Sequence, residues 1–150
     1  MKKINLLLLL LFCFSSVISI AQSAEDYVKE GRILLQEQKL QAAINAFSDA
    51  INLQPSHADA YLFRGVSYSL FERYELALQD YEHSINLVPN NPFAVYNKAF
   101  VYHKLQRYDE ALVSYDEALR LDPSNRDAYY NRALIYDSMD KTKKAIKDYT

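Results

Sequence analysis

Residues 92–125 read PFAVYNKAFVYHKLQRYDEALVSYDEALRLDPSN, and this stretch contains the pattern that decides the fold. Small and large apolar residues recur at its positions 4, 8 and 11 and again at positions 20, 24 and 27. These residues are Val95, Ala99 and Tyr102, then Ala111, Tyr115 and Ala118. Steps of four and three residues place side chains on one face of a helix. The stretch is therefore predicted to form two amphipathic helices, and Pro123 prevents the second one from continuing.

The same pattern recurs along the chain with a period of 34 residues, the spacing of Pro55, Pro89 and Pro123. The predicted repeats are residues 24–57, 58–91, 92–125 and 126–150, the last incomplete, and positions are counted from the first residue of each. Position 8 holds Gly31, Gly65, Ala99 and Ala133. Position 20 holds Ala43, Ala77, Ala111 and Ala145, and position 24 holds Phe47, Tyr81, Tyr115 and Tyr149.

These residue types suit closely packed helix pairs. Small residues at positions 8 and 20 let two helices approach, and the large aromatic residues fill the space beside the crossing. Polar residues that can cap a helix stand before each repeat, namely Ser23, Ser56, Asn91 and Asn125. Each repeat is therefore expected to begin with a capped helix.

The pattern closely resembles the tetratricopeptide repeat (TPR) family, most nearly in Val95–Ala99, Tyr108–Ala111 and Leu121–Pro123. The resemblance covers residues 24–150. It implies an all-α fold of stacked helix-turn-helix repeats that forms a right-handed superhelical solenoid. The chain departs from the family at position 15, where glycine is frequent and this sequence has Gln38, Glu72, Gln106 and Asp140.

Composition excludes several other classes of protein. Two glycines in 150 residues are too few for the tight turns of sheets and for phosphate-binding loops. A net charge of −2 gives no basic surface for nucleic acid, so no nucleic-acid partner is expected. The single cysteine, Cys13, cannot form an internal disulfide.

The first 21 residues resemble a secretory signal peptide. Lys2 and Lys3 precede an apolar run, and the small residues Ser19 and Ala21 occupy positions −3 and −1 of a cut after Ala21. We therefore expect export to a periplasmic or extracellular location, with no other membrane association. The alternatives are an uncleaved segment that anchors the protein in a membrane, and a buried helix.

No motif points to catalysis, a cofactor or a metal site. His57, His83 and His103 are far apart and are expected to be solvated surface residues. The carboxylate pairs Asp109-Glu110 and Asp116-Glu117 are neighbours in sequence, so their side chains diverge around a helix. The chain is therefore predicted not to be an enzyme and to hold no cofactor.

The concave face is the predicted ligand-binding surface, since in this family the first helix of each repeat lines it. Positions 2, 5, 9 and 12 share one side of that helix, and apolar residues occupy many of them in repeats two to four. The candidate groove residues are Leu62, Val66, Phe93, Tyr96, Asn97, Phe100, Tyr130 and Leu134. Partial burial by neighbouring repeats and a self-association surface are the alternatives.

A known variant of the family binds a C-terminal carboxylate through lysine, asparagine and arginine at fixed positions. Only Asn97 fits that set here, so a carboxylate clamp is not expected. The predicted partner is a peptide or protein segment held by a non-catalytic scaffold. The second hypothesis is the N-terminal interaction module of a larger envelope protein. The incomplete fourth repeat suggests a fragment of a longer array, or self-association through its C-terminal edge.

Overall fold

The computed structural model describes residues 22–150, and the expected signal segment lies outside them. All regular structure within this range is helical. The helices are α2 (Ala24–Gln36), α3 (Leu40–Leu53), α4 (Ala58–Leu70), α5 (Tyr74–Leu87), α6 (Pro92–Lys104), α7 (Tyr108–Leu121), α8 (Arg126–Ser138) and α9 (Thr142–Tyr149). Each of the four frames thus contains two helices, as the periodicity predicts.

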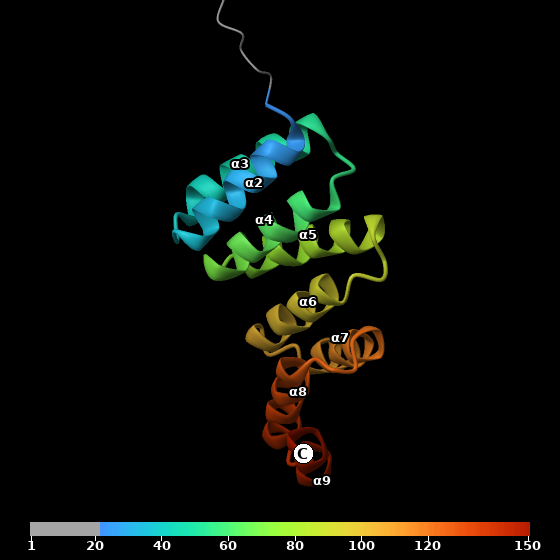
Figure 1. The fold of residues 1–150 in the computed structure, drawn as a ribbon. Helices are drawn as coiled ribbons and strands as arrows, with labels where there is room; N and C mark the ends of the chain where they lie inside the picture. Colours follow the sequence, from blue (N-terminus) through green and yellow to red (C-terminus); the bar gives the residue numbers. More distant parts are fainter. Residues whose placement is uncertain (1–21) are drawn as a thin grey trace, which may run out of the picture.

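The helices form four pairs stacked in chain order, from α2–α3 to α8–α9 (Figure 1). The second helix of each of the first three pairs also packs on the first helix of the next pair, at junctions α3–α4, α5–α6 and α7–α8. The first helices contact one another along the stack, whereas the second helices within residues 22–150 do not. The first helices therefore line the inner, concave side of the stack.

The core is built from the small and aromatic residues of the repeat. Ala43, Ala77 and Ala111 at position 20 are fully buried, as are the rings at position 24 of the first three repeats. A Cβ atom added to Gly65 would lie 2.8 Å from the ring of Tyr81, so glycine allows this ring to lie directly against α4.

Side-chain caps begin three of the four first helices. Ser23 and Asp26 form a reciprocal capping box on α2, and Asn91 and Asn125 accept backbone N–H groups of α6 and α8. The expectation that Ser56 caps α4 is wrong. The residue at that place is His57, whose side chain makes no capping hydrogen bond.

All four first helices end in the same turn, and its central residue has a positive φ. These residues are Gln38 (60°), Glu72 (57°), Gln106 (58°) and Asp140 (56°), at position 15 of each repeat. After α6, the N–H of Gln106 donates to His103 O and that of Arg107 to Tyr102 O, both at 2.9 Å. This is the Schellman hydrogen-bond pattern, which explains why the family favours glycine there.

A bidentate ion pair joins the two helices of the second repeat. Nε and Nη2 of Arg64 on α4 donate to the two carboxylate oxygens of Asp80 on α5, each at 2.8 Å. Nη1 of Arg64 also reaches back across the junction and donates to Ser48 Oγ at 3.1 Å. One guanidinium therefore connects three helices in a fixed geometry.

The same arginine-centred arrangement recurs in the fourth repeat, whereas in the third repeat a lysine makes a single contact. Arg132 donates to both carboxylate oxygens of Asp148 and to Asp116 Oδ1 across the junction, all at 2.6 Å. Lys98 takes this position in the third repeat and lies 3.3 Å from Glu82 across the junction. Position 7 of one repeat thus meets position 25 of the preceding repeat at every junction.

Candidate ligand-binding groove

Three aromatic residues of α6 lie on the concave side. Phe93 follows the cap residue Asn91, and its side chain is 48% exposed, whereas Tyr96 and Phe100 are half-buried. The ammonium group of Lys104 lies 5.2 Å from the ring centroid of Phe100, a cation–π contact. The exposed part of α6 thus offers one open ring and two partly covered rings.

Tyr96 connects α6 to α7 and α8. Its ring packs against that of Tyr115 on α7 with centroids 6.1 Å apart, and its hydroxyl oxygen accepts a hydrogen bond from Asn131 Nδ2 at 3.1 Å. Burial, with the charge of Asp127 nearby, raises the pKa of the Tyr96 hydroxyl. Tyr96 therefore remains a neutral part of the groove wall at physiological pH.

Helix α8 supplies the most exposed part of the groove. The side chains of Tyr130 and Leu134 are 56% and 36% exposed. The ring of Tyr130 packs against Tyr149 of α9 with centroids 5.9 Å apart. Helices α6 and α8 contact each other, and the Asn131–Tyr96 hydrogen bond joins them. We call Phe93, Tyr96, Phe100, Tyr130 and Leu134 the aromatic surface.

The other sequence-predicted groove residues offer less to a ligand. Leu62 is only 3% exposed and belongs to the buried core cluster that extends from α4 to α8. Val66 is partly buried against the same core. The amide nitrogen of Asn97 donates to the carbonyl oxygen of Phe93 at 2.7 Å, so it is bound within its own helix. The exposed and half-buried apolar residues among the candidate groove residues are therefore mainly those of α6 and α8.

The groove positions hold four exposed carboxylates and one exposed cation: Glu25, Asp59, Asp127, Asp137 and Arg32. Asp137 accepts a hydrogen bond from the hydroxyl group of Tyr149 at 2.9 Å.

The expectation that the histidines are solvated holds for the exposed His83 but is wrong for His57, whose side chain is only 14% exposed. It is also wrong for His103, which is half-buried against Tyr108, and burial together with Lys104 lowers the pKa of His103. His103 is therefore neutral at pH 7 and adds no positive charge beside Asp127 and Asp137.

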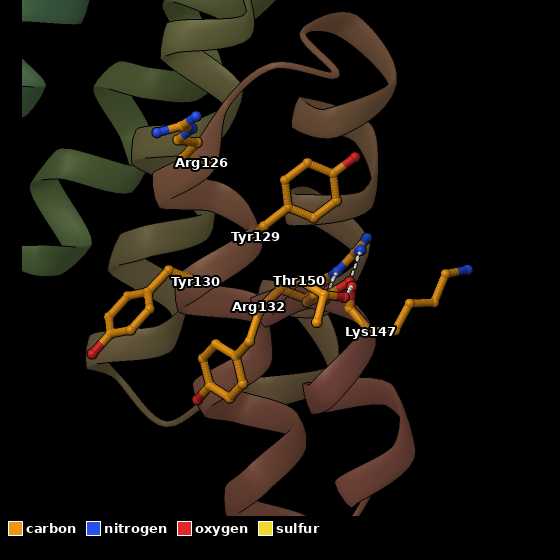
Figure 2. A pocket seen from close by; sticks show the side chains of 8 residues that line it. Arg126, Tyr129, Tyr130, Arg132, Lys147 and Thr150 are labelled. Atoms are coloured by element: carbon orange, nitrogen blue, oxygen red, sulfur yellow. Dashed lines mark hydrogen bonds and ion pairs between the residues drawn. The ribbon is translucent and has the colours of Figure 1, made fainter.

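Sequence reasoning missed a pocket that lies between α8 and α9. This pocket has a volume of about 710 Å³. Its lining residues are Arg126, Tyr129, Tyr130, Arg132, Lys147, Asp148, Tyr149 and Thr150 (Figure 2). The 16-residue spacing of arginine and aspartate, in Arg64 and Asp80 and again in Arg132 and Asp148, is a signal for the ion pair in the pocket wall, not for the pocket itself.

Neither a metal site nor a membrane span is found in the described part of the chain. No group of three His, Cys, Asp or Glu side chains within residues 22–150 is placed to hold a metal ion. No helix in that range is long and apolar enough to cross a membrane.

Solved structures show the same fold at low sequence identity. A crystal structure of MamA superposes with a TM-score of 0.80 at 21% identity, over 84% of this chain and 74% of MamA. The first TPR domain of Spaghetti (RPAP3), bound to the HSP90 peptide SRMEEVD, gives 0.77 at 20% identity, over 80% of this chain and 95% of that domain. The Arabidopsis OM64 TPR domain superposes with a TM-score of 0.74 at 23% identity, over 76% of this chain and 94% of that domain.

Sequence profiles of one repeat family account for most of the helical stack. A tetratricopeptide repeat profile matches residues 28–92, a second matches residues 80–113, and a TPR repeat profile matches residues 101–140. None of the curated proteins compared with the chain matches it. The profiles, the 34-residue period and the stacked helix pairs together show that the chain belongs to the tetratricopeptide repeat family.

Proposed function

We propose that this protein is an exported, non-catalytic scaffold whose concave face binds a peptide or protein segment. The observation that carries the proposal is the aromatic surface on α6 and α8, where Phe93 and Tyr130 are about half exposed. Large apolar side chains gathered on one concave surface are typical of a binding site. Because the helix stack holds them in place, little conformational entropy is lost on binding.

The charges beside the aromatic surface favour a partner segment that is apolar and flanked by basic residues. Asp59, Asp127 and Asp137 are exposed on the concave side, whereas the cation of Lys104 already covers the ring of Phe100. Opposite charges at the edge of an interface steer association and select partners. The Spaghetti domain supports peptide binding as a use of this fold, since it holds a peptide. We expect the ligand here to have the opposite charge to that EEVD-ending peptide.

A display library of random 12-residue peptides tests this proposal. Selection on the immobilised protein is expected to enrich peptides with an aromatic or aliphatic residue flanked by lysine or arginine. Enrichment of acidic peptides would contradict the charge argument, and no enrichment would contradict peptide binding. The affinity of a selected peptide is then measured by calorimetry.

The decisive variant is Phe100→Asp, which removes a ring at the centre of the aromatic surface. We expect it to weaken peptide binding by about 2 kcal/mol or more, the scale of an aromatic hot spot. Its matched control is Val113→Asp on α7, because Val113 is 70% exposed and lies outside the groove. Thermal melting separates the outcomes: a large drop for Phe100→Asp alone would assign this ring to the core.

Export rests on the first 21 residues and has its own test. N-terminal sequencing of the protein isolated from its native host is expected to begin at Gln22 or within a few residues of it. Recovery of intact Met1 in the membrane fraction would instead support the anchored alternative.

A further inference from the structure

The third repeat lacks a carboxylate that the second and fourth repeats bury between their two helices. The residues at positions 7 and 23 are, in chain order, Glu30 and Ala46, Arg64 and Asp80, Lys98 and Ser114, and Arg132 and Asp148. Both arginines pair with the aspartate of their own repeat, and both aspartate side chains are at most 5% exposed. The first repeat has no cation at position 7 and no carboxylate at position 23. The third repeat keeps the cation, Lys98, but has serine in place of its partner.

A pocket of about 360 Å³ lies between α6 and α7 at this place in the third repeat. Its lining residues are Lys98, Tyr102, Asp109, Glu110, Val113 and Ser114. A serine side chain does not extend to the cation as aspartate does, but its hydroxyl group can donate a hydrogen bond. Helix α5 packs on α6, and α8 packs on α7, so neighbouring helices hold both walls of the pocket in place. The pocket therefore has room for a carboxylate that comes from another molecule.

Lys98 can hold a second carboxylate beside the one it already contacts. Its one ion pair within residues 22–150 joins Nζ to Glu82 Oε1 across the junction at 3.3 Å, and the Glu82 side chain is 54% exposed. An ammonium group has three donors. Arg132 at the equivalent position of the fourth repeat binds two carboxylates, those of Asp148 and Asp116, both at 2.6 Å. A ligand carboxylate at Lys98 would reproduce this arrangement.

The wall beside Ser114 is apolar. Val113 at position 22 is 70% exposed, whereas the other repeats have polar residues at this position: Asn45, Gln79 and Lys147. The ring of Tyr102, itself only 8% exposed, also lines the pocket. An exposed apolar side chain beside a cation favours a ligand that has an apolar group next to its carboxylate.

The charges at the other end of the pocket restrict the ligand further. Asp109 and Glu110 lie about one helical turn before Val113 and Ser114 on α7. Arg107 lies 2.7 Å from Glu110 and offsets its charge, whereas Asp109 is exposed. Lys98 and Arg107 thus face three carboxylates, those of Glu82, Asp109 and Glu110. A ligand with several acidic residues would be repelled, so we expect one carboxylate at the Lys98 end and an uncharged or basic residue at the Asp109 end.

We propose that this pocket is a second interaction site, which binds a single aspartate or glutamate side chain of a partner protein together with an adjacent apolar residue. The partner's carboxylate takes the place that Asp80 and Asp148 occupy in their own repeats, and its apolar residue packs on Val113. The site goes beyond peptide binding in the groove, because none of the residues that line it belongs to the aromatic surface.

Two blocked dipeptides test the proposal by nuclear magnetic resonance on the isotope-labelled full chain. Acetyl-Leu-Glu-amide supplies the apolar residue and the carboxylate, and acetyl-Leu-Gln-amide has nearly the same shape without the charge. The glutamate probe is expected to shift the amide signals of Val113 and Ser114 in a saturable way. The glutamine probe should bind at least about ten-fold more weakly, the effect of losing one hydrogen bond between charged groups. Equal binding of the two probes, or no shift at Val113 and Ser114, would overturn the proposal.

Three variants assign the binding to this pocket. Lys98→Met should weaken binding of the glutamate probe at least about ten-fold, and Ser114→Asp should do the same because its own carboxylate fills the place. Lys104→Met removes a lysine of the same helix outside the pocket and should bind the probe like wild type. Thermal melting confirms that each variant is folded. Undiminished binding by folded Lys98→Met or Ser114→Asp would overturn the proposal. Phe100→Asp should leave probe binding unchanged, and a loss in this variant would place the probe in the groove instead.

Discussion

The four turn residues at position 15 adopt a left-handed conformation without being glycine. This conformation costs an ordinary residue roughly 1–2 kcal/mol. Glycine avoids this cost, but it also raises the conformational entropy of the unfolded chain, which cancels part of the gain in stability. We expect Gln106→Gly to stabilise the protein by about 0.5 kcal/mol, measured by urea unfolding. The control is Gln79→Gly in the middle of α5, which should destabilise by about 1 kcal/mol. Equal losses in both variants would contradict the turn argument.

His103 makes stability depend on pH. Burial and Lys104 lower its pKa below the ordinary value of 6.5. The unfolded chain therefore binds this proton at a higher pH than the folded chain, so the His103 contribution to stability decreases as pH falls below about 6.5. When the pH is lowered from 7 to 5, the urea concentration at the unfolding midpoint should decrease less in His103→Gln than in wild type. His83→Gln, at an exposed residue, is the control, and an identical loss in wild type and His103→Gln would refute the prediction.

At the scale of the helix pair, the Arg64–Asp80 contact is a bidentate ion pair with a buried carboxylate. The side chain of Asp80 is 5% exposed, so removing its partner leaves a buried carboxylate uncompensated. Arg64→Met is expected to cost about 3–5 kcal/mol in urea unfolding, whereas the double variant with Asp80→Leu should recover most of this loss. Arg120→Met breaks the exposed pair with Glu117 and should cost at most about 1 kcal/mol. Similar losses in the two single variants would mean that burial of Asp80 carries little weight.

Close packing of the two helices within a repeat depends on position 20. Ala111 is fully buried on α7 among residues of α6 and α8. Ala111→Leu is expected to overpack this crossing and to cost about 1–3 kcal/mol, seen as a lower denaturation midpoint. Ala42→Leu on the exposed side of α3 is the control. An unchanged midpoint for Ala111→Leu would show that the crossing has room for a larger side chain.

At the scale of the whole molecule, stability is expected to vary along the stack. Helix α5 packs on both α4 and α6, whereas α9 contacts only α8 within residues 22–150 and buries only Ala145. Repeat arrays open in units, and units with one neighbour open first. Native-state hydrogen exchange should therefore give the lowest protection in α9 and the highest in α5 and α6. Uniform protection would indicate that the stack unfolds as one unit.

The sequence predicts the helix pairs and their order because packing at positions 8, 20 and 24 repeats with the chain. It predicts the groove less well, since a residue's exposure depends on what neighbouring helices place over it. Leu62 and Tyr130 both occupy position 5, yet Leu62 is buried and Tyr130 is open. The N-cap position of His57 in place of Ser56, and the pocket beside α9, likewise depend on how the helices are placed in three dimensions, which the sequence spacing alone does not specify.

The turns at position 15 have a consequence for how such a protein can evolve. Their closing hydrogen bonds join backbone atoms, and the residues that begin α3, α5, α7 and α9 add no side-chain caps. A mutation that changes the side chain of an exposed turn residue therefore does not remove the backbone atoms whose hydrogen bonds close the turn. The angle between paired helices is therefore retained during evolution, while exposed residues such as Phe93 and Tyr130 can be substituted. A descendant could thus acquire a different ligand without rebuilding its scaffold.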